Sequence, residues 1–395
     1  MHIVFNVLAA RSHLNPTLST AHELKRRGHR ITYITGKSLA PTIRKQGFNM
    51  IEAGVAVSLS ELDEIFPERA SLPAPRKDEF DLTQLMPFLE PPAIHDAFLP
   101  LLKNKRPDLI VRDQFAFGGY LVGEKYNIPH ATINITAGWP RSKEFLNSIL
   151  ATPLNELRAE YALPDDPELN TLFPYLRLDT APPTLLPKGI STISTARSFN
   201  QFATKKIVAN ETSLPSWVTE LPHDKTVLVT LGTLWNQSNE LYNLIIHAIQ
   251  DEAVNVIVAT GRNTEQAMTG NFPANVRVVE YIPFTALLPH LDAVVFHAGF
   301  ISLLTMLWAA IPMVAIPVGA DQFGNAEAIE MAGVGIGIKP DERSSINIRN
   351  ALMSVLNQSS YREAAKRVQA DMSTQLSVAE ACDLLEQVAR TGKPV

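Results

Sequence analysis

Short apolar segments alternate with longer segments of helical character along the first half of the chain. Ile3–Leu8, Arg30–Thr35 and Leu109–Arg112 are apolar runs with the length of a buried strand. The first run is followed, after a predicted loop, by Thr17–Arg27, which has helical composition, basic residues in its last turn and Gly28 at its end. Strands separated by helices predict parallel β-sheets and therefore an α/β fold.

The second half repeats this pattern. Thr226–Leu231 and Val254–Ala259 are predicted strands, and Val294–Val295 leads through a polar turn into the leucine-rich helix Leu303–Ala310. A proline ends that helix, and Met313–Val318 then has the apolar character of a buried parallel strand. Each half of the chain is therefore expected to form its own parallel sheet.

A change in composition separates the two halves. After Leu178 the chain has several prolines with Ser and Thr between them, and it has few sustained apolar runs. Because 395 residues exceed the roughly 250–300 at which one core usually divides, two domains are expected. We place the first domain at residues 1–204, a linker at 205–224 and the second domain at 225–375, followed by an amphipathic helix at 376–395.

Overall composition excludes several classes of protein. The content is 46% hydrophobic and 19% charged, which is ordinary for a globular protein, and the net charge of −5 gives no basic surface for nucleic acid. A single cysteine, Cys382, excludes an internal disulfide framework and a cysteine-rich metal site. The longest apolar run is interrupted by Pro312 and Pro317, so no membrane-spanning segment is expected, and Met1–Ala10 has no basic leader before its apolar part. A cytoplasmic location is expected.

Candidate chemistry is concentrated where predicted strands end. His297, Gly299 and Ser302 lie at a predicted strand–turn–helix junction, and a helix N-terminus offers unpaired N–H groups and a positive dipole end to phosphate. Asp321 and Gln322 follow the next strand, at the edge where open α/β sheets bind ligands. One βαβ unit therefore predicts a diphosphate site beside a polar site of the size of a sugar. Taken singly, these residues could equally be a satisfied strand-end histidine and a solvated loop.

Taken together, these groups resemble a known signature. The series His297-x-Gly299-x-x-Ser302, the segment Ala309–Pro312 and Asp321-Gln322-x-x-Asn325 resemble, in order and spacing, the donor-binding signature of the family-one UDP-dependent glycosyltransferases. Bacterial macrolide-type and plant secondary-metabolite enzymes belong to that family. The resemblance implies the GT-B fold, in which two Rossmann-like domains with parallel sheets face each other across a cleft. It also implies that the last helix packs back on the N-terminal domain.

The loop after the first strand supports the same family. Residues 9–16 contain no glycine, so the G-x-G-x-x-G loop of a dinucleotide-binding enzyme is missing and a nicotinamide oxidoreductase is not expected. His13-Leu14-Asn15-Pro16 resembles the family's His-x-x-Pro element, whose histidine is the catalytic base, although Ser12 stands where glycine is common. Asp113 matches the acid that orients this histidine. The alternative for Asp113 is a cap of the following helix.

The resemblance extends to the nucleotide. Gly232 and Thr233 match the family's loop at the diphosphate, where glycine permits close backbone approach and a hydroxyl can donate. Tyr281 matches the ring that stacks on uracil, and Ile282 matches the backbone that bonds the edge of the base. Three positions depart from the family pattern. Ile301, Thr305 and Phe284 stand where Asn, a ribose-binding Glu and, in plant members, Gln are usual.

The acceptor is less defined by sequence. In the family, the irregular region between residues 54 and 107 forms part of the acceptor pocket, and aromatic and apolar residues here could line it. The candidates are Phe80, Phe88, Trp139, Phe145 and Leu146. For any one of these side chains, plain core packing is the alternative.

The expected activity is inverting transfer of a hexose, with glucose as the expected sugar, from a UDP-sugar to a hydroxyl of a small lipophilic acceptor. His13 would act as general base, oriented by Asp113. The nucleotide sugar is a co-substrate, no cofactor or metal is expected, and neither a nucleic-acid partner nor an integral membrane segment is expected. A monomer or a homodimer would fit. Two alternatives stay open, namely dTDP in place of UDP and a non-catalytic homologue that binds nucleotide sugars.

Overall fold

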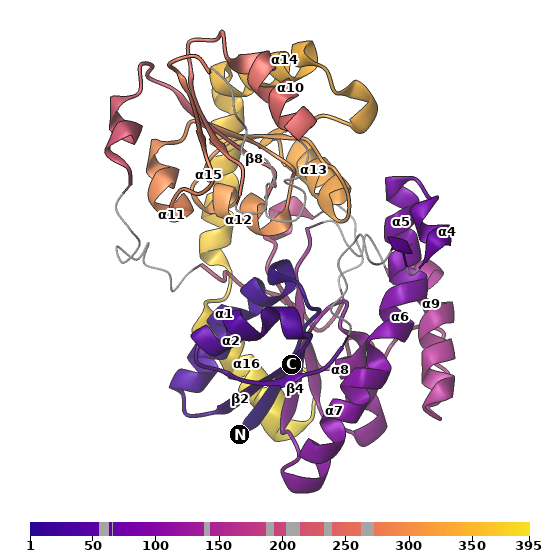
Figure 1. The fold of residues 1–395 in the computed structure, drawn as a ribbon. Helices are drawn as coiled ribbons and strands as arrows, with labels where there is room; N and C mark the ends of the chain where they lie inside the picture. Colours follow the sequence, from indigo (N-terminus) through magenta and orange to yellow (C-terminus); the bar gives the residue numbers. More distant parts are fainter. Residues whose placement is uncertain are drawn as a thin grey trace. The chain divides into compact units, whose positions relative to one another are not determined.

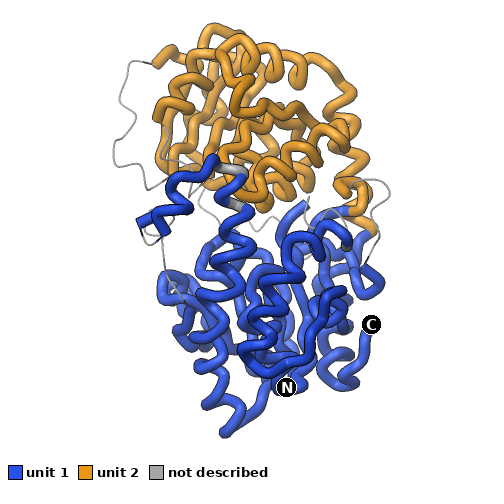
Figure 2. The backbone as a smooth tube through the Cα atoms, turned by 90° about the vertical axis from the view of Figure 1, so that its right-hand side faces the viewer, with its two compact units in different colours: residues 1–182, 188–204, 375–395 blue, residues 183–187, 205–374 orange. Residues whose placement is uncertain are grey.

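A computed structural model describes most of the chain as two compact units, coloured separately in Figure 2. The residues described are 1–54, 63–64, 66–137, 143–186, 193–202, 214–232, 239–261 and 272–395. Unit 1 comprises residues 1–182, 188–204 and 375–395, and unit 2 comprises residues 183–187 and 205–374. Each unit has its own sheet and its own core.

Unit 1 is built on a seven-stranded parallel sheet with the order β3-β2-β1-β4-β5-β6-β7 (Figure 1). Its strands are β1 His2–Asn6, β2 Arg30–Thr35, β3 Asn49–Glu52, β4 Leu109–Asp113, β5 His130–Asn134, β6 Leu176–Asp179 and β7 Ala196–Ser198. The central strands β1, β4 and β5 are buried along their whole length, as expected of parallel strands covered on both faces. β1 pairs with β2 and β4, so their carboxyl ends lie at one edge.

The helices of unit 1 surround this sheet. They are α1 Arg11–Arg26, α2 Ala40–Lys45, α4 Pro67–Ala70, α5 Ala74–Phe80, α6 Met86–Leu89, α7 Pro91–Asn104, α8 Phe117–Tyr126, α9 Lys143–Glu160 and α16 Val378–Thr391, with the short turns η1 Lys37–Leu39 and η2 Asp81–Leu85. The predicted loop at residues 9–16 is wrong, because α1 already begins at Arg11 and contains Pro16. The N-cap residue Ala10 makes no side-chain capping bond, so the usual start signal is missing.

Unit 2 contains a six-stranded parallel sheet with the order β10-β9-β8-β11-β12-β13. Its strands are β8 Thr226–Thr230, β9 Asn255–Ala259, β10 Val276–Val279, β11 Ala293–Phe296, β12 Met313–Ala315 and β13 Gly335–Gly337. Its helices and short turns are η3 Pro183–Leu185, η4 Ser216–Glu220, α10 Asn239–Ile249, α11 Phe284–Leu287, η5 Leu288–His290, α12 Phe300–Trp308, α13 Gln322–Met331, η6 Pro340–Glu342, α14 Ser345–Asn357 and α15 Ser359–Thr374. Both sheets are parallel, as the alternating pattern predicts.

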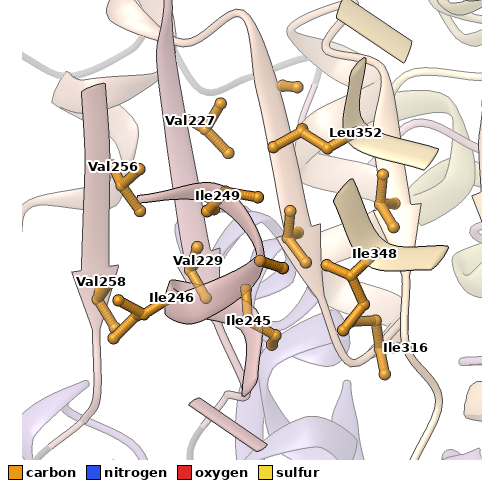
Figure 3. Packing of buried hydrophobic residues seen from close by; sticks show 14 of the residues in the cluster. Val227, Val229, Ile245, Ile246, Ile249, Val256, Val258, Ile316, Ile348 and Leu352 are labelled. Carbon is orange, nitrogen blue, oxygen red and sulfur yellow. The ribbon is translucent and has the colours of Figure 1, made fainter. Parts of the chain in front are cut away.

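The core of unit 2 shows why these segments form these elements. Valines of β8 and β9 pack against isoleucines of α10 and against one face of α14 (Figure 3). The labelled side chains include Val227, Val229, Ile245, Ile246 and Leu352. β-branched residues suit strands, while the spacing of 245, 246 and 249 puts the apolar residues of α10 on one helix face.

The division into units differs from the predicted domain boundary at one short segment. Residues 183–187 lie within the predicted first domain, yet they belong to unit 2. There the backbone N–H and hydroxyl of Thr184 donate to Asp371 on α15, at 3.2 and 2.8 Å. The chain therefore enters unit 2 briefly and returns before its main crossing near residue 204.

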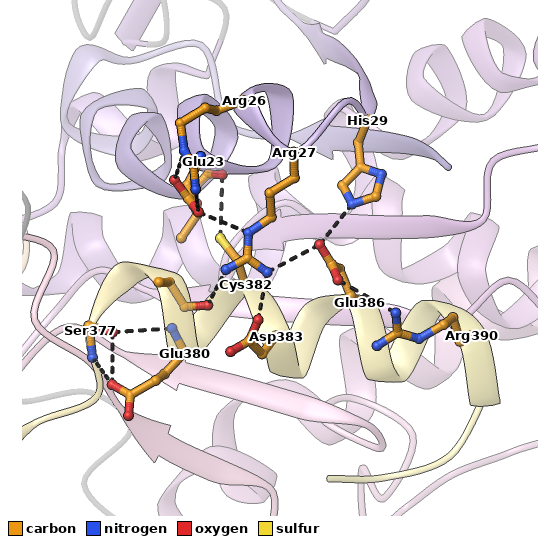
Figure 4. Close-up of polar contacts among 12 residues, drawn as sticks. Glu23, Arg26, Arg27, His29, Ser377, Glu380, Cys382, Asp383, Glu386 and Arg390 are labelled. Carbon is orange, nitrogen blue, oxygen red and sulfur yellow. Dashed lines mark hydrogen bonds and ion pairs between the residues drawn. The ribbon is translucent and has the colours of Figure 1, made fainter.

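α16 packs on α1 within unit 1 (Figure 4). Ser377 and Glu380 form a capping box at its start, in which the side chain of each accepts a hydrogen bond from the backbone N–H of the other. Arg27 of α1 pairs with Asp383 at 2.6 Å and with Glu386 at 3.2 Å. The helix is therefore fixed both by its apolar face and by charged groups at the rim of the contact. No helix of the described residues combines the length and apolar character needed for a membrane crossing.

Candidate functional site

The first half-site lies at the carboxyl edge of the unit 1 sheet. Asp113 is the last residue of β4, and His13 lies in the first turn of α1, which follows β1. His13 Nδ1 lies 3.3 Å from Asp113 Oδ2, and the two side chains are 16% and 0% exposed. The distance suits an ion pair, but the alignment is not that of a hydrogen bond, because Nδ1 has no such partner. The structure thus brings the predicted base and its acid together.

The backbone fixes Asp113 from both sides. Leu8 N–H donates to Oδ2 at 2.7 Å, and Phe115 N–H donates to Oδ1 at 2.8 Å. α8 has Ala116 as its N-cap with no side-chain capping bond, so the alternative role of Asp113 as a helix cap is excluded. A buried carboxylate held in this way can orient and stabilise an imidazolium next to it.

A third ionisable side chain, Glu90, lies within electrostatic reach of Asp113. Glu90 is 7% exposed, and its Oε2 is buried without a hydrogen-bond partner. It is the N-cap residue of α7, and the next two residues, Pro91 and Pro92, have no N–H to donate. Burial, and then the negative charge of Asp113, raises the pKa of Glu90 to about 8, so this carboxyl group is neutral at pH 7. The sequence analysis missed this residue, although Glu-Pro-Pro is a visible sign of an unsatisfied cap.

We expect Glu90→Gln to stabilise the protein increasingly as pH rises. The folded pKa of Glu90 is about 8 against an ordinary value of 4.5. Below pH 4.5 both states keep the proton, between the two values only the folded state keeps it, and stability is lost until pH reaches about 8. At pH 7 this loss is roughly 3 kcal/mol, and glutamine avoids it. Denaturant unfolding between pH 5 and 8 measures the growing difference.

Glu52→Gln is the matched control for this measurement. Glu52 is on β3 of the same unit, is exposed, and pairs with Arg44 at 2.9 Å. An exposed pair of this kind contributes little, so its replacement should leave the slope of stability against pH nearly unchanged. A constant difference between Glu90→Gln and the parent from pH 5 to 8 would show that Glu90 is ionised throughout.

The acceptor candidates lie among the helices of unit 1. Phe80 ends α5 and meets Phe66 edge to face, while Phe88 packs against the core cluster of α8 and α9. Leu146 on α9 is 2% exposed and belongs to that cluster, so its position is that of a core residue. Phe145 is half-buried on α9. Trp139 lies outside the described residues.

The second half-site is the turn between β11 and α12 in unit 2. His297 follows β11, Gly299 is the N-cap of α12, and Ala298 between them has φ +63°. A Cβ at Gly299 would come within 2.4 Å of His297 Nε2, and one at Gly232 would come within 2.7 Å. Both glycines are therefore needed for the imidazole to lie against the ends of β8 and β11. Burial lowers the pKa of His297 to about 4, so it is a neutral donor at pH 7.

The rest of the nucleotide candidates follow this turn. Ser302 and Thr305 lie one turn apart on α12, and both are half-buried. The Thr305 hydroxyl donates to the Ile301 carbonyl at 2.7 Å, which is a bond within its own helix. Tyr281 is 60% exposed, whereas the neighbouring Ile282 is buried. Thr233 lies outside the described residues.

Residues 317–322, which we call the sugar loop, comprise most of the connection after β12 and Gln322, the first residue of α13. Asp321 Oδ2 accepts a hydrogen bond from Asn325 Nδ2 at 2.8 Å, and the same nitrogen donates to the Ala298 carbonyl at 2.9 Å. Asn325 thereby ties the sugar loop to the turn at His297. Gln322 Oε1 accepts from the N–H groups of Val318 and Gly319 at 2.7 and 3.2 Å. The side-chain oxygen of Gln322 therefore holds the backbone of the loop in place.

The described residues contain no cluster of His, Cys, Asp and Glu suited to a metal ion. What they do contain is the buried pair of His13 with Asp113 in unit 1 and, in unit 2, a helix N-terminus with a neutral imidazole beside a loop that carries a carboxylate. A proton acceptor, a diphosphate site and a site for hydroxyl groups are the parts that glycosyl transfer requires.

Comparison with known proteins agrees with this chemistry. Residues 244–388 match the family model of the erythromycin biosynthesis protein CIII-like C-terminal domain. The chain is 27% identical to 4'-demethylrebeccamycin synthase of Lentzea aerocolonigenes over 95% of this chain and 96% of the relative. It is 24% identical to the oleandomycin glycosyltransferase of Streptomyces antibioticus over 98% and 90%.

Solved structures have the same fold. CalG4, the calicheamicin glycosyltransferase, has a TM-score of 0.80 and 25% identity, with 99% of this chain and 98% of that chain covered. The glycosyltransferase VinC, solved in complex with dTDP, has a TM-score of 0.78 and 21% identity, with 99% and 100% covered. The protein is a glycosyltransferase with the GT-B fold that uses nucleotide-sugar donors. In sequence and fold it is similar to the family-one glycosyltransferases of the macrolide type.

Proposed function

We propose that the protein transfers a hexose, with inversion, from a nucleoside diphosphate sugar to a hydroxyl of a small lipophilic acceptor. The observation that carries this proposal is the 3.3 Å approach of His13 Nδ1 to the buried, backbone-held Asp113. With Nδ1 facing the carboxylate, Nε2 is the atom that takes the acceptor proton. A chain that only binds nucleotide sugars has no chemical need for this pair.

In the proposed step the acceptor oxygen attacks the anomeric carbon as its proton moves to His13. The bond between that carbon and the diphosphate oxygen breaks, and the diphosphate leaves with the electron pair. The N-terminus of α12, with His297 and Ser302, is suited to stabilise the departing negative charge, and this role requires no metal. Asp321 would accept hydrogen bonds from sugar hydroxyls.

The donor is proposed to be a UDP-hexose, with UDP-glucose as the first choice and a dTDP-hexose as the alternative. UDP-glucosyltransferase A1 of Starmerella bombicola is 25% identical to this chain, over 97% of this chain and 91% of the relative. Two features favour dTDP: Thr305 takes the place of the ribose-binding Glu, and its hydroxyl is engaged with Ile301. Thymidine nucleotides lack the ribose 2′-hydroxyl that such a Glu would bind.

Thr305→Glu is expected to tighten UDP binding by about 1–2 kcal/mol, near the lower end of what a hydrogen bond to a charged group contributes. A carboxylate one turn from Ser302 can reach both ribose hydroxyls, which the threonine hydroxyl cannot do while it bonds the helix backbone. The same change should improve dTDP binding less. Calorimetry with UDP and dTDP measures both, and Thr305→Gln is the control of equal length without charge. Weaker UDP binding in Thr305→Glu would contradict the assumption that the side chain at position 305 of α12 faces the ribose.

A panel of nucleotide sugars tests the proposed function. UDP-glucose, dTDP-glucose and related donors would be incubated with a phenolic acceptor and with an aliphatic alcohol, and the products would be read by mass spectrometry. Transfer of a hexose with inverted anomeric configuration supports the proposal. Binding of nucleotide sugars without transfer to any acceptor would instead support the non-catalytic alternative.

A further inference from the structure

The sugar loop needs support from outside its own sequence. Ala320 within it has φ +55°, a left-handed conformation that a residue with a Cβ adopts only when its surroundings require it. Asp321 follows directly, so a change at Ala320 would redirect the carboxylate. Gln322 and Asn325 hold the loop from the helix that it enters.

Arg343 holds the loop from a different part of unit 2. It follows η6, in the connection between β13 and α14, and β13 is the strand that pairs with β12. Its Nη2 donates to the carbonyl oxygen of Pro317, the first residue of the sugar loop. Proline has no N–H to give, so its carbonyl is the one main-chain group by which residue 317 can be fixed.

The environment of Arg343 is unusual for an arginine. Burial lowers its pKa, and its Nε is buried without a hydrogen-bond partner. Among the residues that the structure describes, no carboxylate offsets the effect of burial on its charge. A partly desolvated cation without a counter-ion is energetically unfavourable. Neither solvation at the surface nor a salt bridge therefore accounts for an arginine at this position. Within the described part of the chain, the hydrogen bond that its guanidinium donates is the one to the Pro317 carbonyl.

We propose that Arg343 is a positioning residue for the donor sugar, which fixes the first residue of the sugar loop and thereby the direction of Asp321. The proposal rests on the proposed function, in which Asp321 binds sugar hydroxyls. Three side chains then hold the loop at three places: Arg343 at the Pro317 carbonyl, Gln322 at the next two N–H groups and Asn325 at the Asp321 carboxylate. Arg343 is the member that lies outside the signature.

The test compares the intact donor with its nucleotide alone. Arg343→Met keeps the apolar stem and removes the donor, and Arg343→Lys keeps one donor with a shorter reach. We expect Arg343→Met to raise KM for UDP-glucose, or for dTDP-glucose if that is the donor, about tenfold. The dissociation constant of free UDP or dTDP should change by less than twofold. Arg343→Lys should recover part of the loss. A purely structural role of Arg343 would weaken binding of the intact donor and of the free nucleotide by similar factors.

Arg349→Met is the matched control, since Arg349 is an exposed arginine on α14 that pairs with Glu252. It should change neither constant. Equal weakening of donor and free nucleotide in Arg343→Met, or no weakening of either, would overturn the proposal, and if that variant does not fold, Arg343→Lys gives the same comparison. Asp321→Ala separates the two hypotheses. If Asp321→Ala weakens the intact donor and the free nucleotide equally, the assignment of the loop to the sugar is wrong. If Asp321→Ala weakens only the intact donor and Arg343→Met does not, the loop assignment holds and the role proposed for Arg343 is rejected.

Discussion

Replacing His13 by alanine is expected to lower turnover by about 10²–10⁴, the usual contribution of a positioned general base. Without the imidazole, no general base takes the proton of the acceptor hydroxyl, whereas the nucleotide half-site of unit 2 is unchanged. Binding of UDP or dTDP should therefore stay nearly unchanged. Steady-state kinetics with an unactivated alcohol, together with calorimetry for the nucleotide, measures the two quantities separately.

The variant Asp113→Asn tests the same role of His13 independently. Asp113→Asn should remove a large part of the same rate, and the double variant should be no slower than His13→Ala, because the pair acts as one unit. Asp113 also accepts two backbone hydrogen bonds, so Asp113→Asn could destabilise the fold. The unfolding curve of this variant must therefore be compared with that of the parent protein. Full transfer to an unactivated hydroxyl by His13→Ala would remove this residue from the mechanism.

Replacing Asp321 by alanine is expected to reduce sugar transfer by roughly a hundredfold or more, since hydrogen bonds to a charged group contribute about 1.5–3 kcal/mol each. The carboxylate lies in the sugar loop, and the residues at the helix N-terminus of α12 are separate from it. Free nucleotide should therefore bind almost as well as to the parent. Calorimetry with UDP and with UDP-glucose resolves the difference.

Asn325 needs attention in that experiment, because it donates to both Asp321 and Ala298. Loss of the carboxylate leaves Asn325 bonded to the turn at His297, so that turn should keep its shape. Asp321→Asn is the control that preserves size and removes charge. Equal losses for UDP and UDP-glucose would place this loop at the nucleotide and not at the hexose.

The sequence predicts the parts of the site that depend on local order. His297, Gly299 and Ser302 lie at a strand–turn–helix junction because an apolar strand, a glycine and a leucine-rich helix follow one another directly. The parallel sheets follow from alternation of strands and helices for the same reason. The GT-B fold and the glycosyltransferase class follow from the resemblance of this junction to a known signature, and the comparisons support both.

Features set by distant contacts could not be predicted in this way. The use of Gln322 Oε1 as a brace for the loop depends on how α13 meets β12, and the contact of Arg343 with Pro317 joins residues 26 positions apart. Glu90 is buried only because α7 packs in unit 1, and no motif includes it. The start of α1 was missed since a helix without a capping side chain and with an internal proline resembles a loop.

The return of α16 to unit 1 has a consequence for synthesis of the chain on the ribosome. Unit 1 lacks residues 375–395 until all of unit 2 has been made. At about 5–20 residues per second, the intervening segment takes roughly ten to thirty seconds to translate. During that time the surface of α1 that later contacts α16 stays uncovered, and Arg27 has neither Asp383 nor Glu386 as a partner. The N-terminal unit is therefore the last of the two to be completed, although most of it emerges first.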